Sequence, residues 1–309
     1  MRIPPMLALS VVVLYAFGYP LGALGIAAMS PFLLLFLRFA VSGVLMLGVV
    51  RATGRRLPRG ADLGHAVVVG ILTQATQFLG CYLGLQAGVP AGVAALIIGV
   101  NPAVTTVVAR IALGEALTPR RALAAVLGLA AVVTACWSTV PALAHAGAGI
   151  GFTLLGLAGI ALGGVYQQRF CREVDPLAGN AVGMTVAAVP AGVLVVLFGA
   201  TVTDPARGAV VLVLMVLLSS MTATTLYLRV IGIAGASGAA ILFAVIPSVS
   251  ALFAFLLLGE PVHPGVIAGL ALGGAACAIA SRGGRRAPAP DPAVDEPARR
   301  GAGAVRSGA

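Results

Sequence analysis

Polar side chains are rare in the long apolar stretches of this sequence, and the few that interrupt them are the candidates for chemistry. Arg38 is the charged residue that lies deepest in such a stretch. If the stretch spans a membrane, a guanidinium there would attract a substrate carboxylate. It would equally reach the lipid headgroups by snorkelling, because it lies only ~10 Å below the start of its helix at 1.5 Å per residue. The sequence leaves both roles open.

A second group of polar residues shares one helical spacing. Gln74 and Gln77 lie three residues apart, and Ser219 and Thr222 repeat that spacing further along the chain. Residues three apart share a face of an α-helix, and lipid would penalise a polar face. Two arrangements would avoid that cost in free energy: the polar face lines a cavity, or it forms hydrogen bonds with a neighbouring helix. We favour the cavity, which makes all four residues candidates for substrate binding.

Three further side chains and two prolines complete the predicted site. Asn101 stands beside Pro102 in the middle of an apolar stretch. Tyr82 and Tyr227 each offer a ring face and a hydroxyl, which suits a pocket for varied substrates, although interfacial belts and core packing also use tyrosine. Pro102 and Pro247 each remove a backbone hydrogen bond and bend their helices. We expect them to act as hinges, or to leave a static kink that packing fills.

The sequence offers little for other chemistry. It contains no HExxH or GxSxG motif and no aspartyl pair, so we predict that it is not an enzyme and uses no cofactor. The four cysteines form no CxxC and no metal-ligand spacing, so we predict no metal site. No carboxylate is expected at mid-membrane depth, which leaves a histidine near a helix end, such as His65, as the candidate for proton transfer. A membrane-embedded enzyme and a channel-like facilitator are the rival functions.

The composition identifies the elements that must position these residues. Hydrophobic residues make up 60% of the chain and charged residues 9%, with a mean hydropathy of +1.08. Soluble proteins carry roughly a quarter charged residues, so this is a polytopic membrane protein. At about 20 residues per span, the 309 residues predict about ten transmembrane helices with short loops.

The formal charge of +10 does not indicate a nucleic-acid partner, because the arginines fall in alternate gaps between the apolar stretches. That alternation is typical of the positive-inside rule. It predicts a multi-pass protein of the inner (plasma) membrane with both termini in the cytoplasm. The loop that follows Val50 is the most basic gap and the best cytoplasmic marker.

The chain repeats itself at a fixed offset of 145 residues. Residues Ala94–Pro119 return as Ala239–Pro264 without a gap, and a central proline, a Leu-Gly-Glu and a following proline occur in both. Such self-similarity indicates duplicated structural units. We call two residues separated by this offset twins. Among the pairs above, Tyr82 and Tyr227 are twins, whereas the twin of Arg38 is Gly183.

The repeat divides the chain into two units. We predict a first five-helix repeat over residues 6–137, a linker over 138–150, a second five-helix repeat over 151–281, and a disordered cytoplasmic tail over 282–309. Because each repeat holds an odd number of spans, the second crosses the membrane in the opposite sense, and the repeats are inverted. Inverted repeats place their substrate near the midplane, at broken or kinked helices.

These features resemble the drug/metabolite transporter superfamily, EamA type. The resemblance rests on ten spans in two halves and on the repeated Pro, Leu-Gly-Glu and Pro of the fourth helix in each half, and it covers residues 6–280. It implies an inner-membrane secondary transporter, an exporter or exchanger of small metabolites, amino acids or drugs, that works by alternating access around a midplane cavity. The unpaired Arg38 is a departure from twofold symmetry.

Glycines in the last apolar stretch are spaced so that another helix could pack against them. Gly265, Gly269 and Gly273 recur every four residues and allow close approach of another helix, either within the chain or in a homodimer. The expected partners are a small-molecule substrate, the lipid bilayer and, if the glycines act between chains, a second copy.

Overall fold

The computed structural model describes residues 3–89, 91–116, 118–135, 137, 147, 149–259 and 262–282, and these residues are almost entirely helical. Most of the predicted linker and nearly all of the predicted tail lie outside them. The elements in chain order are α1 (Pro5–Ala28), α2 (Pro31–Ala52), α3 (Ala61–Gly70), η1 (Ile71–Leu79), α4 (Gly80–Gln86), α5 (Ala91–Gly99), α6 (Asn101–Leu113), α7 (Pro119–Ala135), α8 (Gly149–Phe170), α9 (Pro176–Phe198), α10 (Pro205–Leu214), η3 (Met215–Ala223), α11 (Thr224–Ala240), η4 (Ile241–Ala244), α12 (Ile246–Leu258) and α13 (Pro264–Arg282).

The prediction of an all-helical membrane protein is confirmed. Within the described residues, six helical stretches are long and apolar enough to cross a membrane, and two shorter apolar helices follow at Ile246–Leu258 and Pro264–Ala280. One of the six, Pro205–Ala244, runs from the third helix of the second half into the start of the fourth, because α11 continues through a sharp turn at Gly235 with φ of 77°. The count of ten crossings stays a prediction.

Prolines and glycines set the helix boundaries. Most of the long helices begin with proline at the first position, where the missing N–H costs nothing because it would have no partner within the helix. Gly114 and Gly259 end α6 and α12 in the left-handed conformation, with φ of 64° and 70°. The repeated Leu-Gly-Glu is therefore a helix stop, and the proline five residues after each glycine begins the next helix.

The fourth helix of each half is broken rather than bent. In the first half α5 ends at Gly99 and α6 begins at Asn101, so that Pro102 lies in the first turn of a new segment. In the second half the 3₁₀ segment η4 precedes α12, and Pro247 takes the same place. The expectation of a bent continuous helix is corrected to a discontinuous one, because proline is tolerated at a helix start and disrupts a helix interior.

The third helix of each half contains a π-helical segment that the sequence did not reveal. Nine residues of η1 and nine of η3 occupy twin positions to within one residue. Each lies at the middle of a span, between α3 and α4 in one half and between α10 and α11 in the other. A π-helix bonds five residues back and is rare, and where it occurs it often marks a functional site.

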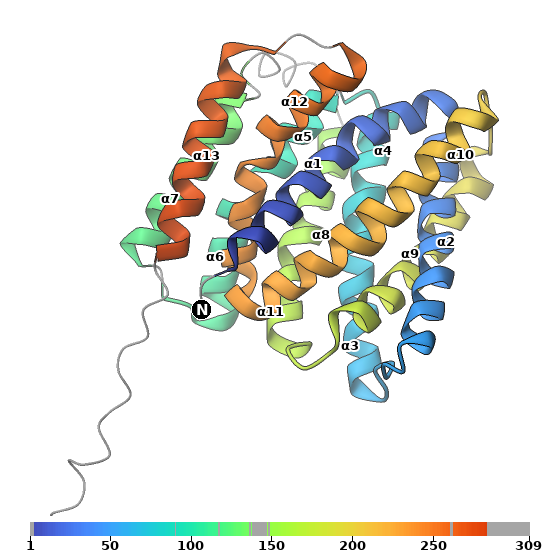
Figure 1. Ribbon diagram of the computed structural model, residues 1–309, viewed down its shortest axis with the longest axis horizontal. Coiled ribbons are helices and arrows are strands. Elements are labelled where there is room, and N and C mark those ends of the chain that lie inside the picture. Colours follow the sequence, from blue (N-terminus) through green and yellow to red (C-terminus); the bar gives the residue numbers. More distant parts are fainter. Residues whose placement is uncertain are drawn as a thin grey trace, which may run out of the picture.

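The two halves pack around an approximate twofold axis. The second helices, α2 and α9, pair along their lengths, as do the fifth helices, α7 and α13 (Figure 1). The first helix of each half packs on the π segment of the other, α1 on η3 and α8 on η1. The contact of α8 with η1 is intimate, since a β-carbon at Gly159 would lie 2.6 Å from the carbonyl oxygen of Leu72.

Several arginines gather at one end of the bundle, although Arg207 pairs with Asp204 at the other. Both the start of α1 and the Arg120–Arg121 start of α7 line one cavity there, and Arg55 pairs with Asp175 between two loops. We call this the basic end. At the opposite end, two loops join where Ser30 N–H donates to Thr201 O (2.9 Å). Helix α1 begins at the basic end whereas its counterpart α8 finishes there, so the matched helices run antiparallel (Figure 1).

Candidate functional site

Arg38 lies inside the bundle, with 2% of its surface exposed. Its Nε donates to Ser220 Oγ (2.7 Å) and its Nη2 to Ser219 Oγ (3.1 Å). The guanidinium carbon lies 4.3 Å from the ring centroid of Phe78, a cation–π distance. The snorkelling alternative is therefore wrong: the side chain extends from α2 across to η3 instead of along α2 to the membrane surface.

The π turn of η3 presents the two serines to Arg38. Wider winding frees backbone carbonyls, and these find other partners: Thr222 Oγ1 donates to Leu217 O (2.7 Å) and Thr224 Oγ1 to Ser219 O (3.2 Å). Asn180 Nδ2 on α9 donates to Ser220 O (2.8 Å) and to Thr225 Oγ1 (3.0 Å). Asn180 thus holds η3 in the conformation in which Ser220 contacts the guanidinium of Arg38.

Thr222 does not share the buried face of Ser219, which corrects the prediction drawn from their spacing. Ser219 is buried, whereas Thr222 is exposed on the outside of the bundle and bonds to its own helix. The winding of the π segment does not decide burial by itself, because η1 has the same winding and is covered closely by α8, where a β-carbon at Gly156 would lie 2.8 Å from Gln77 O. Gln74 and Gln77, in η1, are both buried.

Several buried polar atoms near the bundle centre have no hydrogen-bond partner among the described residues. They are Ser42 Oγ, Gln74 Oε1, Asn101 Nδ2, Asn180 Oδ1 and Ser248 Oγ. Asn101 accepts from Thr105 Oγ1 (2.8 Å) through its carbonyl oxygen, and its side chain lies within reach of the Tyr227 hydroxyl. Burying such a group unpaired is costly, so each is an atom that a polar ligand or ordered water would satisfy.

The tyrosines connect Arg38 to the rest of the core. Tyr82 and Tyr15 both lie close enough to Arg38 to interact electrostatically with its charge. Tyr15 packs edge-on against Tyr227 (centroids 5.8 Å apart) and against Phe243 (5.3 Å), and Tyr227 also contacts Phe243 (5.4 Å). We call Tyr15, Tyr227 and Phe243 the aromatic cluster. It joins α1, α11 and η4 at the centre of the protein.

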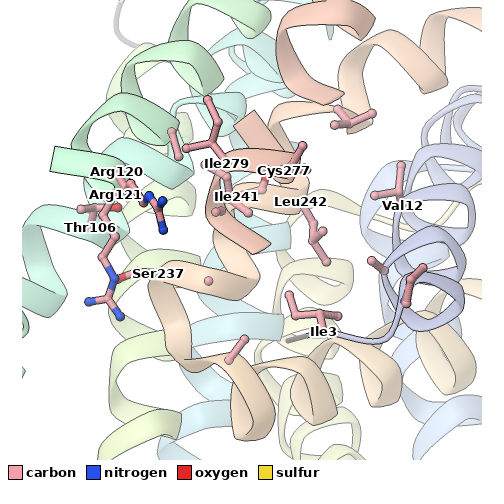
Figure 2. Close-up of a pocket in the computed structure, with 18 of the residues that line it drawn as sticks. Ile3, Val12, Thr106, Arg120, Arg121, Ser237, Ile241, Leu242, Cys277 and Ile279 are labelled. Carbon is pink, nitrogen blue, oxygen red and sulfur yellow. Dashed lines mark hydrogen bonds between the residues drawn. The ribbon is translucent and has the colours of Figure 1, made fainter. Parts of the chain in front are cut away.

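A large cavity opens at the basic end, with a volume of about 1290 Å³ (Figure 2). Its walls are mainly aliphatic and come from the start of α1, from α11 to α12 and from the end of α13, while Thr106, Ser237 and Arg121 supply polar groups on one side. None of the eight predicted binding residues lines it. Cavity and polar centre are separate, and the aromatic cluster stands between them: Phe243 follows the wall residue Leu242, and Tyr15 lies one turn along α1 from Val12.

A hydrogen-bonded network closes one rim of the cavity. Glu115 Oε2 accepts from Arg121 Nη1 (2.8 Å) and from Ser237 Oγ (3.2 Å), and Glu115 Oε1 accepts from Gln168 Nε2 (2.7 Å). Gln168 Oε1 in turn accepts from Ala236 N–H (2.5 Å), just after the turn at Gly235. Glu115 thus pairs just beyond the end of α6, and its twin Glu260 lies outside the described residues.

His65 is at the basic end and not in the polar centre. Its Nδ1 lies 2.8 Å from the hydroxyl of Tyr166, and its ring stacks on Phe170 with centroids 4.8 Å apart. These contacts tie the start of α3 to the end of α8. They give His65 a packing role and bring it no closer to Arg38.

The structure places Arg38 and Ser219, both predicted from the sequence, in contact with each other, whereas Ser220, Asn180 and Tyr15 were not among the predicted residues. Ser220 was detectable as the neighbour of a chosen residue. Asn180 and Tyr15 have apolar twins, Leu35 and Ile160, so the search for matched polar pairs passed over them. An unmatched polar residue in a duplicated sequence is the signal that would have found both.

Comparisons with known proteins identify the architecture. The profile of the EamA-like transporter family matches residues 3–137 and again 147–282. A solved structure titled only as the crystal structure of a protein aligns with a TM-score of 0.75 and 18% identity, over 89% of this chain and 95% of that one. At that identity the likeness concerns the fold alone. No curated protein sequence matches the chain.

Replacing Asn180 by leucine, the residue at its twin position, should lower the free energy of unfolding by about 1–3 kcal/mol, because a freed carbonyl of η3 then loses its donor. Thermal unfolding in detergent measures this. The matched control is Thr185→Val on the same helix, since the Thr185 hydroxyl bonds only to Ala181 O of its own helix (2.8 Å). Equal effects of the two changes would show that Asn180 does not fasten η3.

Proposed function

The chain belongs to the EamA-like transporter family, and we propose that it is a secondary transporter that carries small organic anions or zwitterions across the inner membrane by alternating access. Arg38 binds the carboxylate of the substrate, and Ser219, Ser220 and Tyr82 surround the bound group. Export or exchange is the expected direction. By the positive-inside rule the basic end faces the cytoplasm, and both termini lie there.

The observation that carries this proposal is the unpaired charge of Arg38. Ion pairs among the described residues join Arg55 to Asp175, Arg121 to Glu115 and Arg207 to Asp204, and none involves Arg38. Two hydroxyls and an aromatic ring are weak compensation for a cation removed from water. An arriving carboxylate would supply the missing charge through a bidentate, charge-assisted contact, so the site favours anionic groups.

The broken helices and the cavity support a carrier over a channel-like facilitator. The cavity at the basic end stops at the aromatic cluster, so a substrate must displace packed rings before it reaches Arg38. Discontinuous helices at Pro102 and Pro247 supply segments that can move separately. The substrate enters from the basic end, passes Tyr15, Tyr227 and Phe243, and leaves when the opposite end opens.

The aliphatic walls of the cavity also bear on the substrate. Val12, Leu242, Val245 and Val249 offer apolar contact and no charge, which suits a molecule with an apolar body. An organic acid that combines one carboxylate with a hydrophobic remainder matches both the entrance and the anion site.

Arg38→Gln should reduce the transport of a carboxylate substrate and spare its neutral amide, because only the carboxylate loses a charge-assisted bond. A loss of about 1.5–3 kcal/mol corresponds to roughly tenfold to a hundredfold in rate. Initial uptake into everted vesicles at equal protein level measures it. Arg38→Lys should rescue partly at best, because a single ammonium cannot make the forked contact.

The amide serves as the control in the same vesicles. Equal losses for both substrates would assign Arg38 to folding or gating. Unchanged uptake of the carboxylate in both variants would remove Arg38 from the binding site and contradict the proposal.

Pro102→Ala and Pro247→Ala should each slow transport severalfold while the protein still inserts, because alanine allows the two helical segments to fuse and stiffen. Pro190→Ala is the matched control, since Pro190 lies inside the unbroken helix α9. Transport rates per inserted protein give the comparison. If all three variants transport at the parental rate, the breaks are static features.

The proposed orientation can be tested by fusing alkaline phosphatase to different loops, because this enzyme is active only outside the cytoplasm. A fusion after Arg56 at the basic end should be inactive, and one after Gly88 at the opposite end should be active. The reverse pattern would overturn the assignment of the basic end to the cytoplasm.

A further inference from the structure

The two ends of the bundle are built from twin residues, yet the large cavity opens at the basic end, and the opposite end has only a smaller pocket of about 480 Å³ between the end of α7 and the start of α13. At the basic end the start of α1 stands away from α11 and α7, and the cavity lies between them (Figure 2). At the opposite end the start of α8, the counterpart of α1, packs directly on the end of α4. The difference therefore has to come from the positions at which the twins are not the same residue.

Glycines allow the contact at the opposite end. A β-carbon at Gly149 would lie 2.6 Å from Val89 Cγ2 and 3.0 Å from Gly84 O. A β-carbon at Gly269 would lie 2.7 Å from Ser248 Oγ and 2.8 Å from Ala131 O, and one at Gly265 would overlap the carbonyl oxygen of Thr134. We call Gly84, Gly149, Gly265 and Gly269 the closing glycines. Each lets one backbone touch another helix directly.

The twins of the closing glycines all carry side chains. Gly149 corresponds to Pro4, Gly265 to Arg120, Gly269 to Ala124 and Gly84 to Arg229. Pro4, Arg120 and Ala124 all line the cavity at the basic end. Ala234, which lines it too, is the twin of Val89, the residue that Gly149 contacts. Three of the four closing glycines thus have twins that line the cavity at the basic end, where Ala124 also packs against Ile241 and Ala276.

We infer that the closing glycines are the gate of the opposite end, and that their replacement by larger twins at the basic end sets the resting conformer open to that side. In lipid, helix association depends on close packing of small residues and not on a hydrophobic driving force. Added side chains at the interface therefore weaken closure directly. The helices pack closely at the opposite end, where these positions are glycines. They stay further apart at the basic end, where the twin positions are Pro4, Arg120 and Ala124.

This inference rests on the proposed function for its purpose, because a gate matters only to a carrier. Its evidence is separate, however, because it concerns which end of the protein admits water. It predicts that methyl groups added at the closing glycines shift the population of conformers from one open to the basic end toward one open to the opposite end.

The test uses two reporter cysteines in a protein whose four native cysteines are replaced by alanine. Ala234→Cys reports on the cavity, and Ile97→Cys reports on the opposite end, where Ile97 is the buried twin of the cavity residue Leu242. A membrane-impermeant thiol reagent is applied to right-side-out and to inside-out vesicles, and the rate of labelling is measured for each reporter.

In the parent we expect Ala234→Cys to be labelled from the basic end and Ile97→Cys to resist labelling from either side. Adding Gly149→Ala and Gly269→Ala should raise labelling of Ile97→Cys from the opposite end severalfold and lower that of Ala234→Cys. The matched control is Gly151→Ala with Gly274→Ala, on the same two helices, where an added β-carbon meets nothing within 4 Å. It should leave both rates unchanged.

The reciprocal variant, Arg120→Gly with Ala124→Gly, adds no bulk and so keeps the test independent of steric damage. It should slow labelling of Ala234→Cys because the basic end can now close. The inference is overturned if neither variant changes the labelling rates, or if the alanine variant raises both rates together, as a loosened protein would. Exchanged accessibility without any transport of organic anions would instead reject the proposed function and leave the gate standing.

Discussion

The guanidinium of Arg38 is buried inside an apolar helix bundle, and the residues at the centre of the protein are arranged around it. Arg38 reaches from α2 to η3, where Ser219 and Ser220 accept from it and Phe78 covers its face. No partner of opposite charge reaches it within the described part of the chain. Such a charge costs free energy, and charged groups retained inside membrane helices usually serve a ligand or an ion.

The π turns explain how two ordinary helices can present this surface. A regular α-helix at η3 would satisfy its own backbone and turn its side chains differently. The wider turn frees carbonyls, which Thr224 and Asn180 then occupy, and it places adjacent serines on the guanidinium. The inverted repeat duplicates the π turn in η1, but only one half carries the arginine, so the duplicated frame holds an asymmetric site.

The sequence predicted the helices and their duplication far better than the residues of the candidate site. The repeat offset located the matching helices. That prolines begin the helices and that the glycine of each Leu-Gly-Glu ends one became evident only in the structure, although both are local effects of backbone chemistry. The π turns were not predictable in the same way, since the choice between two bonding patterns depends on Asn180, which is 40 residues from Ser220. The cavity escaped prediction as well. Its position reflects which end has closed, and that depends on single methyl groups at helix contacts instead of on hydrophobic pattern.

The most direct measurement for the central claim is the stability of an Arg38→Met variant without substrate. If Arg38 is kept for an anion and not for the fold, an apolar side chain of similar length removes the cost of an uncompensated charge. The variant should then be as stable as the parent or more stable, by about 1 kcal/mol or more, although it cannot bind the carboxylate. Thermal unfolding in detergent, with Arg55→Met as a surface reference, gives the comparison. A variant several kcal/mol less stable than the parent would show that Arg38 holds the helices together, and it would contradict the assignment of Arg38 to the substrate.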